Sequence, residues 1–105
     1  MKTEKEIQNE ILDNLYNLDI GFFWQNDSVG IKGRKRENKY RPNGVSDILG
    51  VVGSQFFAIE VKKPGGKILE SQIVFRDRFV RHGGVFILAY SYEDVHDYLV
   101  SHGYI

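Results

Sequence analysis

The feature that most constrains the fold is a pair of short apolar segments separated by a tight turn. Residues 48–52 read Ile-Leu-Gly-Val-Val, Gly53 and Ser54 follow, and residues 55–62 read Gln-Phe-Phe-Ala-Ile-Glu-Val-Lys. Two apolar runs joined by two such turn residues are typical of a β-hairpin. We therefore expect an antiparallel pair of strands over these residues.

Two opposite charges lie inside the second strand of this hairpin. Side chains alternate along a strand, so Glu60 and Lys62 are expected to project from one face while Val61 points to the other. Charged groups in an apolar setting lose solvation unless they are paired or bind a metal. Asp47 precedes the first strand, and antiparallel pairing brings it to the same end of the sheet as Glu60. The three charged residues are therefore predicted to form one site.

The chemistry of these residues fits metal-dependent hydrolysis of a phosphodiester. Mg²⁺ binds oxygen ligands and needs only one or two protein carboxylates, because water and the substrate phosphate supply the rest. Asp47 and Glu60 provide two carboxylates, and Lys62 is placed to hold the attacking water or to stabilise charge on the phosphate. The alternative is a Glu and a Lys on a solvated sheet face, with Asp47 as an ordinary turn residue. The apolar strand, the upstream acid and a neighbouring basic segment favour the metal site.

Composition limits the classes of protein that this chain can represent. A sequence of 105 residues with 42% apolar content is expected to form one domain, residues 1–105. Without cysteine it has no disulfide framework, no thiol nucleophile and no thiolate zinc site. No run approaches the roughly 20 apolar residues of a membrane span, and the first residues read as an amphipathic helix rather than a signal peptide. We therefore expect a cytoplasmic protein with no membrane partner.

The formal net charge is zero, but the basic residues are concentrated in the middle of the sequence. Residues 32–81 carry 12 Lys and Arg against 5 Asp and Glu, whereas residues 1–31 carry 2 against 6. A local basic surface attracts phosphates whatever the net charge of the chain. Residues 28–44 form a long segment with few apolar side chains, so a solvated loop without a ligand is the alternative. The predicted phosphate-binding residues are Lys32, Arg34, Lys35, Arg36, Lys39, Arg41, Lys63 and Lys67.

The rest of the pattern predicts three helices and two more strands around the hairpin. Thr3 is the expected N-cap of the first helix, Gly21 is expected to end it, and Ser91 and Asp94 have the spacing of a capping box. The predicted helices cover residues 4–18, 70–82 and 92–101, and the additional strands cover 22–26 and 85–90. The order αβββαβα predicts an α/β fold in which helices pack on a mixed sheet. The aromatic residues are expected in the core or at a subunit interface rather than as base-stacking platforms.

Several short motifs carry a more specific signal. They are Gly-Val-Ser-Asp-Ile at 44–48, Ala-Ile-Glu-Val-Lys at 58–62, Pro-Gly-Gly-Lys at 64–67, and Gln72. With Glu-Ile-Gln in the first helix and Gly-Gly before the last strand, they resemble the VRR-NUC family of the PD-(D/E)xK nuclease superfamily. The resemblance implies a restriction-endonuclease-like fold, dependence on Mg²⁺ or Mn²⁺, and cleavage of DNA. Small stand-alone members, many from phages in bacterial host cells, are similar to homodimeric nucleases that act on branched DNA such as Holliday junctions.

The resemblance also implies roles for residues of the predicted site. Asp47, Glu60 and the carbonyl of Val61 would bind the metal, and Lys62 would assist the water. Gln72 corresponds to the glutamine of the family and would orient the attacking water or Lys62; the alternative is a polar residue in the first turn of a helix.

A catalytic acid in the first helix is also implied. It corresponds to Glu6, and Glu10 is the other candidate, one turn later on the same face. Thr3 and Glu6 also have the spacing of a capping box, in which Glu6 would instead bond the Thr3 amide.

The main hypothesis is a Mg²⁺-dependent endonuclease that resolves four-way DNA junctions as a homodimer. One chain of this length offers one active site, so cutting both strands of a symmetric junction requires two copies, and a two-fold dimer supplies them. The alternatives are a monomeric nickase or flap nuclease, a catalytically inactive DNA-binding module, and a purely structural domain. The intact Asp47, Glu60 and Lys62 argue against the last two.

Overall fold

The computed structural model describes residues 1–26 and 42–105. Its helices are α1 (Glu4–Leu18), α2 (Glu70–Arg81) and α3 (Tyr92–Ser101), and its strands are β1 (Phe22–Gln25), β2 (Ile48–Val52), β3 (Gln55–Val61) and β4 (Val85–Ala89). Each element agrees with its predicted range to within one residue at either end. The predicted αβββαβα order and the α/β fold class are therefore confirmed.

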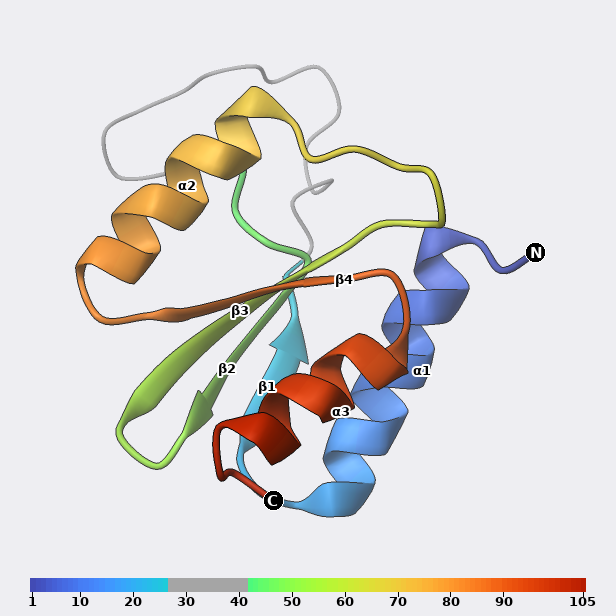
Figure 1. Cartoon of the computed structure of the whole chain (residues 1–105), viewed down its shortest axis with the longest axis vertical. Coiled ribbons are helices and arrows are strands. Elements are labelled where there is room, and N and C mark those ends of the chain that lie inside the picture. The colour runs from blue at the N-terminus through green and yellow to red at the C-terminus, as the bar shows by residue number, and fades with distance from the viewer. Residues whose placement is uncertain (27–41) are drawn as a thin grey trace.

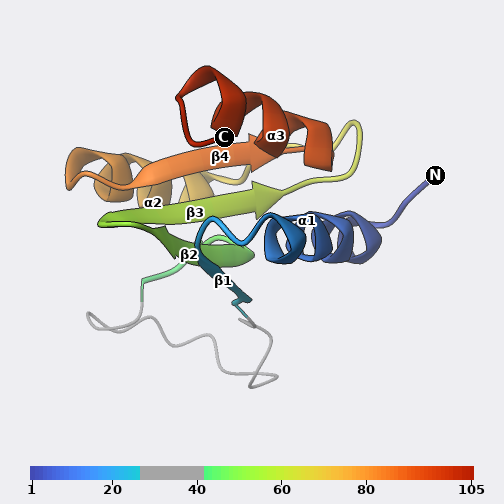
Figure 2. The same cartoon turned by 90° about the horizontal axis from the view of Figure 1, so that it is seen from below.

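The four strands form one mixed sheet in the order β1-β2-β3-β4 (Figure 2). The β1–β2 and β2–β3 pairs are antiparallel, and the turn at Gly53 and Ser54 joins the second pair. Gly53 begins the turn of the central hairpin with φ +61, a conformation that glycine adopts without steric cost. β4 runs parallel to β3, because the chain crosses over through α2 before it returns to the sheet.

The main core lies between one face of the sheet and helices α1 and α3, while α2 lies on the opposite side (Figure 1). Alternate residues of each strand point into this core, as the period of two requires. The buried core residues are Ile7, Ile11, Leu15, Ile48, Phe57, Ile59, Val61, Val85, Ile87, Ala89, Val95 and Leu99. Burying each of the larger side chains contributes about 1.5–3 kcal/mol. This core fixes the position of β2 and β3, which carry the predicted site.

Close backbone contacts place α2 over the sheet and beside the segment that leads into β2. Gly84 lies against the ring of Phe79, so any side chain there would overlap the ring. Gly44 has φ +73 and lies against the backbone of Ser71, which again leaves no room for a side chain. The first turn of α2 therefore packs directly on the segment that ends in Asp47.

The structure differs from the prediction at the C-terminus of α1 and at the N-terminus of α3. α1 ends at Leu18 with Asp19, not Gly21, in the left-handed conformation, and the Asp19 amide donates to the Leu15 carbonyl. Asp tolerates this conformation better than most residues, and Gly21 is instead needed where the backbone passes close to the Val51 carbonyl. The Ser91–Asp94 capping box does not form, because the Asp94 carboxylate accepts from the Tyr90 amide at 2.8 Å.

The Thr3–Glu6 capping box is present as its spacing predicted. Among the described residues, no helix combines the length and the apolar character needed to cross a membrane.

Candidate active site

Asp47 and Glu60 meet at the end of the β2–β3 hairpin away from its turn. Ile48 pairs with Ile59, so the same antiparallel register places Asp47 opposite Glu60. Glu60 is only 2% exposed, because it lies on the sheet face that α2 covers. The expectation that residues far apart in sequence become neighbours at one end of the sheet is confirmed by this register.

The carboxylate of Asp47 is anchored to the strand that carries Glu60. The backbone N–H of Val61 donates to Asp47 Oδ2 at 2.8 Å. Val61 itself points into the core, as the alternation along β3 requires, and its side chain is buried. The bond therefore fixes the Asp47 side chain against β3 through a single carboxylate oxygen.

Two residues that had no predicted role in the site hold the Ser46–Asp47 backbone. The Gln8 amide on α1 donates to the Asp47 carbonyl at 3.3 Å, and the Asn26 backbone N–H donates to the same carbonyl at 2.8 Å. The Asn26 side chain also donates to the Ser46 carbonyl at 3.2 Å. Two features of the sequence indicated Gln8: it belongs to the Glu-Ile-Gln motif, and it is a polar residue on the same helix face as the buried Ile11. No such feature indicated Asn26.

The environment of Glu60 favours its neutral form. Burial, followed by the hydrogen bond and the charge of Asp47, raises the pKa of Glu60 to about 8, whereas the charge of Lys62 acts in the opposite direction. Two carboxylates cannot donate to one another, so Glu60 Oε1 is buried without a hydrogen-bond partner when both acids are ionised. The pair therefore needs either a shared proton or a cation.

Lys62 lies beside Glu60 on the same strand face. Its Nζ is 4.0 Å from Glu60 Oε2, and the Lys62 residue is 8% exposed. The Lys62 backbone N–H donates to the Ala89 carbonyl at 3.0 Å, which continues the β3–β4 pairing beyond the end of β3. This bond fixes the direction in which the chain leaves the sheet and keeps the ammonium next to the acidic pair.

Gln72 links Glu60 to the first turn of α2. Its Nε2 donates to Glu60 Oε2 at 3.1 Å, and its Oε1 accepts from the Leu69 backbone N–H at 2.8 Å. Leu69 has no polar side-chain atom to cap the helix, so Gln72 satisfies one of the free N–H groups at this end. Gln72 is thus a polar residue in the first turn of α2, as the alternative predicted, and its partner in the site is Glu60; its role toward the attacking water or Lys62 stays a prediction.

The first helix does not bring Glu6 or Glu10 to this pair. Glu6 is exposed and accepts from the Thr3 backbone N–H at 3.0 Å, which completes the capping box and lowers the pKa of Glu6. Glu10 forms an ion pair with Lys2. The acid of α1 whose charge reaches Glu60 is Glu4, which raises the pKa of Glu60. The assignment of the helix-one acid to Glu6 therefore stays a prediction, and Glu4 joins Glu6 and Glu10 as a candidate.

The donor set of the Asp47–Glu60 pair fits a hard divalent cation. Among the described residues there is no group of three or more His, Cys, Asp or Glu side chains that could hold a metal. Mg²⁺ does not need such a group, because it usually keeps several waters. The buried Glu60 Oε1 has no partner, and the like charges of the two carboxylates favour a cation between them. Asp47, Glu60 and the neighbouring Val61 carbonyl are the groups that would hold it.

The predicted phosphate-binding residues divide into two sets. Lys63 and Lys67 are exposed in the segment that follows β3, close in sequence to Lys62. The Tyr90 hydroxyl donates to the Gly66 carbonyl at 3.3 Å and ties this segment to the end of β4. The other six residues lie outside the described residues: Lys32, Arg34, Lys35, Arg36, Lys39 and Arg41.

Comparisons with known proteins place this geometry in a known fold. No family model matches the sequence, and no curated protein matches it. A solved structure described as a VRR_NUC domain superposes with a TM-score of 0.67 over 96% of this chain and 98% of its own length, at 21% sequence identity. At that level of identity the likeness concerns the fold. The chain therefore has the fold of a VRR_NUC domain.

Proposed function

We propose that this chain is a Mg²⁺-dependent endonuclease that hydrolyses phosphodiester bonds in DNA. The observation that carries the proposal is the buried Asp47–Glu60 pair, which has an unpartnered carboxylate oxygen and Lys62 at 4.0 Å from Glu60. A structural domain gains nothing from two adjacent acids and a lysine taken out of water. The VRR_NUC fold and the resemblance of the motifs around these residues support the same activity.

In this proposal Asp47 and Glu60 hold the cation. Mg²⁺, when bound, supplies positive charge that activates a water and neutralises charge on the scissile phosphate. Val61 holds Asp47 Oδ2 through its N–H, which orients the carboxylate and leaves its second oxygen for the cation. The raised pKa of Glu60, about 8 without a metal, favours the protonated carboxyl at neutral pH, and a bound cation would lower that pKa.

The neighbouring side chains position these acids and the substrate. Gln72 Nε2 donates to Glu60 Oε2, which leaves Oε1 as the oxygen that has no hydrogen-bond partner and could bind a cation. The ammonium of Lys62 is placed to donate to a phosphate oxygen or to the attacking water. The negative charge of Glu4 also acts on Glu60, and negative charge near the pair favours binding of a cation.

We further propose branched DNA, such as a four-way junction, as the substrate and a homodimer as the active form. The sequence offers a basic segment at residues 32–41 for phosphate contacts, but no arrangement that would read bases, so recognition by shape is favoured. One chain supplies one Asp47–Glu60 pair, and a two-fold dimer supplies the second site that symmetric cutting requires. A monomeric nickase or flap nuclease is the second candidate, because a single site is enough for one cut.

The experiment is a cleavage assay on four substrates of matched sequence: a four-way junction, a flap, a fork and a linear duplex. The intact protein is expected to cut the junction in Mg²⁺ and to be inactive in EDTA. Asp47→Asn is expected to lose at least about 100-fold in rate, whereas Asp13→Asn, at an exposed position of α1, is expected to retain full activity. Binding of DNA without cutting in Mg²⁺ would exclude the nuclease, and equal cutting of linear duplex would exclude junction selectivity.

A further inference from the structure

The segment between β3 and α2 carries a leucine at an unusual position. We call residues 63–69 the cap segment. Leu69 is the N-cap of α2, where Ser, Thr, Asp and Asn are preferred because their side chains accept from the free N–H groups of the first turn. Its side chain forms no such bond and is 58% exposed. A single exposed leucine is ordinary elsewhere on a surface, but at an N-cap it takes the place of a stabilising polar residue. The fold therefore does not account for Leu69.

The first half of the cap segment is held beside Lys62. The Gly66 N–H donates to the Lys63 carbonyl at 2.8 Å, and Gly65 has φ +86, so these residues form a tight turn. A Cβ at Gly66 would lie 3.4 Å from Lys62 Cβ, so the turn packs against the stem of that lysine. The Tyr90 hydroxyl donates to the Gly66 carbonyl at 3.3 Å. The turn thus has a defined position next to the proposed active site.

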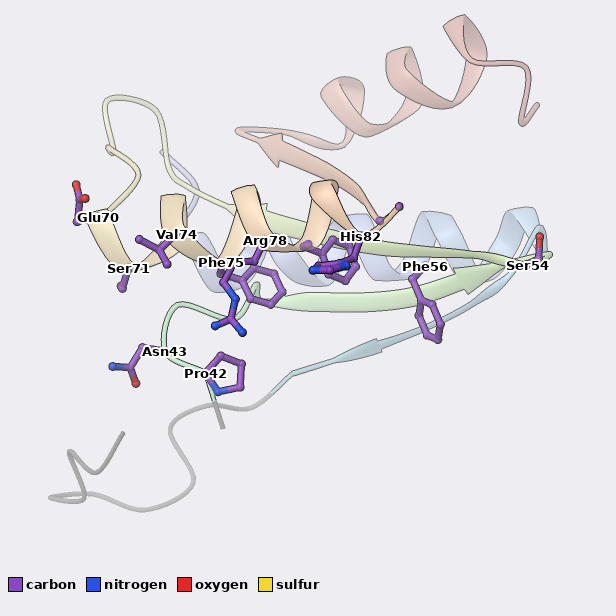
Figure 3. Close-up of a pocket in the computed structure, with 13 residues that line it drawn as sticks. Pro42, Asn43, Ser54, Phe56, Glu70, Ser71, Val74, Phe75, Arg78 and His82 are labelled. Atoms are coloured by element: carbon purple, nitrogen blue, oxygen red, sulfur yellow. The ribbon is translucent and has the colours of Figure 1, made fainter. Parts of the chain in front are cut away.

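The other end of the cap segment is tied to Glu60. The Leu69 N–H donates to Gln72 Oε1 at 2.8 Å, and Gln72 Nε2 donates to Glu60 Oε2 at 3.1 Å. One amide group therefore separates the Leu69 backbone from a carboxylate of the proposed active site. Leu69 does not line the hollow of about 760 Å³ beside α2, where Glu70 and Ser71 form the wall at this end of the helix (Figure 3). Its exposed side chain lies near the active site and outside this hollow.

The charges around Leu69 favour a nucleic acid as its partner. Lys63 and Lys67 are exposed, and the cap segment contains no acidic residue. Cations beside an apolar side chain match a nucleotide, which joins a charged phosphate to a base with an apolar face. Glu70 directly follows Leu69 and is exposed, so its negative charge disfavours a phosphate at the beginning of α2 itself. The arrangement therefore favours a base at Leu69 and phosphates at the two lysines.

A protein partner fits this surface less well. A stable protein–protein contact covers about 800 Å² on each side. The apolar side chains of this region are Leu69, the partly buried Ile68 and the 37% exposed Tyr90, which together cover much less. A small apolar group is, by contrast, enough to act on DNA, because side chains such as leucine insert between base steps and unstack them. Unstacking is easiest for a base that is already unpaired, so such a group favours branch points over continuous duplex.

We propose that Leu69 contacts an unstacked base at the branch point of the DNA substrate, while Lys63 and Lys67 hold the flanking phosphates. The inference rests on the proposed nuclease function and adds to it the residue that selects branched DNA. Leu69 takes no part in hydrolysis, which stays with the acidic pair and Lys62. It acts on the choice of substrate by contacting the base.

The first test separates recognition of DNA from stability of the fold. Leu69→Ser supplies a better N-cap, so its melting temperature is expected to stay equal or to rise. The rate of cutting a four-way junction relative to a linear duplex is nevertheless expected to fall about 10-fold. Leu69→Met keeps the apolar volume and should retain the ratio. Val80→Ser, at a 49% exposed position in the last turn of α2, is the matched control and should also retain it.

The second test needs no cleavage. A junction with aminopurine, a fluorescent adenine analogue, at its branch point reports unstacking as increased fluorescence. In EDTA, at protein concentrations that saturate the junction, we expect the intact protein to raise this fluorescence about twofold or more, and Leu69→Ser to lose the increase.

A saturated junction without increased fluorescence, or a Leu69→Ser variant that keeps both the increase and the cleavage ratio, would overturn the inference. Equal losses in Val80→Ser or Leu69→Met would overturn it as well. Unstacking without cleavage in Mg²⁺ would contradict the proposed function alone, and cleavage of the junction without unstacking would contradict this inference alone.

Discussion

The Gln72 amide group bridges Glu60 and the beginning of α2. It donates to Glu60 Oε2 at 3.1 Å and accepts from the Leu69 N–H at 2.8 Å. One side chain therefore both caps a helix and holds the Glu60 carboxylate, so the orientation of Glu60 depends on the position of α2.

Replacing Gln72 with leucine removes both bonds while keeping a similar volume. We expect the free energy of unfolding to fall by about 1 kcal/mol, because the helix N-terminus loses a cap, and Mg²⁺ affinity to fall about 10-fold, because Glu60 is no longer oriented. Urea unfolding and calorimetric titration measure the two effects. Gln25→Leu, at an exposed position of β1, is the control and is expected to change neither. Unchanged Mg²⁺ affinity in Gln72→Leu would show that the bond to Glu60 has no role in metal binding.

Glu60 is expected to make folding stability depend on pH. Its pKa rises from 4.5 to about 8 on folding, so within this window the folded chain holds a proton that the unfolded chain has released. In the absence of metal, the free energy of unfolding should therefore fall as pH rises from 4.5 to about 8. Glu60→Gln cannot ionise, and the difference in stability between the two proteins should grow in favour of the variant across that range. A constant difference measured by urea unfolding in EDTA would contradict the raised pKa.

Gln8 is expected to act on the site through the backbone of Asp47. Gln8→Leu removes the 3.3 Å hydrogen bond to the Asp47 carbonyl and places an apolar side chain of similar size on the buried face of α1. The Asn26 N–H still satisfies that carbonyl, so stability should change by less than about 1 kcal/mol. Metal affinity should fall several-fold, because Asp47 becomes more mobile. Asn9→Leu, on the exposed face of the same helix, is the matched control, and equal effects of the two variants would refute the role of Gln8.

Glu4 and Glu6 are expected to have separate effects. Glu4→Gln should lower the pKa of Glu60 and weaken Mg²⁺ binding, because Glu4 is the α1 acid whose charge reaches Glu60. Glu6→Gln weakens the ionic half of the capping box with Thr3 and should lower the melting temperature without changing Mg²⁺ affinity. Titration calorimetry and thermal melts of both variants check the assignment. If Glu6→Gln were the variant that weakened metal binding, the original assignment of the helix-one acid would be right.

The sequence predicted the meeting of Asp47 and Glu60 because local rules determine it. A two-residue turn and the alternation of side chains fix the register of the hairpin, and that register places the two acids opposite each other. The element order followed from equally local patterns.

The parts of the site that the sequence did not predict depend on long-range contacts. Gln8 and Asn26 bond backbone groups 39 and 20 residues away, and no short pattern encodes such pairs. Glu4 and Glu6 differ by two positions, which on a helix is about 200° of rotation, so the choice between them depends on how α1 packs.

Anomalous diffraction from crystals grown with Mn²⁺ would show directly whether Asp47 and Glu60 bind a divalent cation. We expect a strong anomalous peak bonded to both carboxylates, and its loss in Asp47→Asn crystals grown under the same conditions. Crystals with millimolar Mn²⁺ that show no peak between Asp47 and Glu60, or a peak only at the acidic residues of α1, would contradict it.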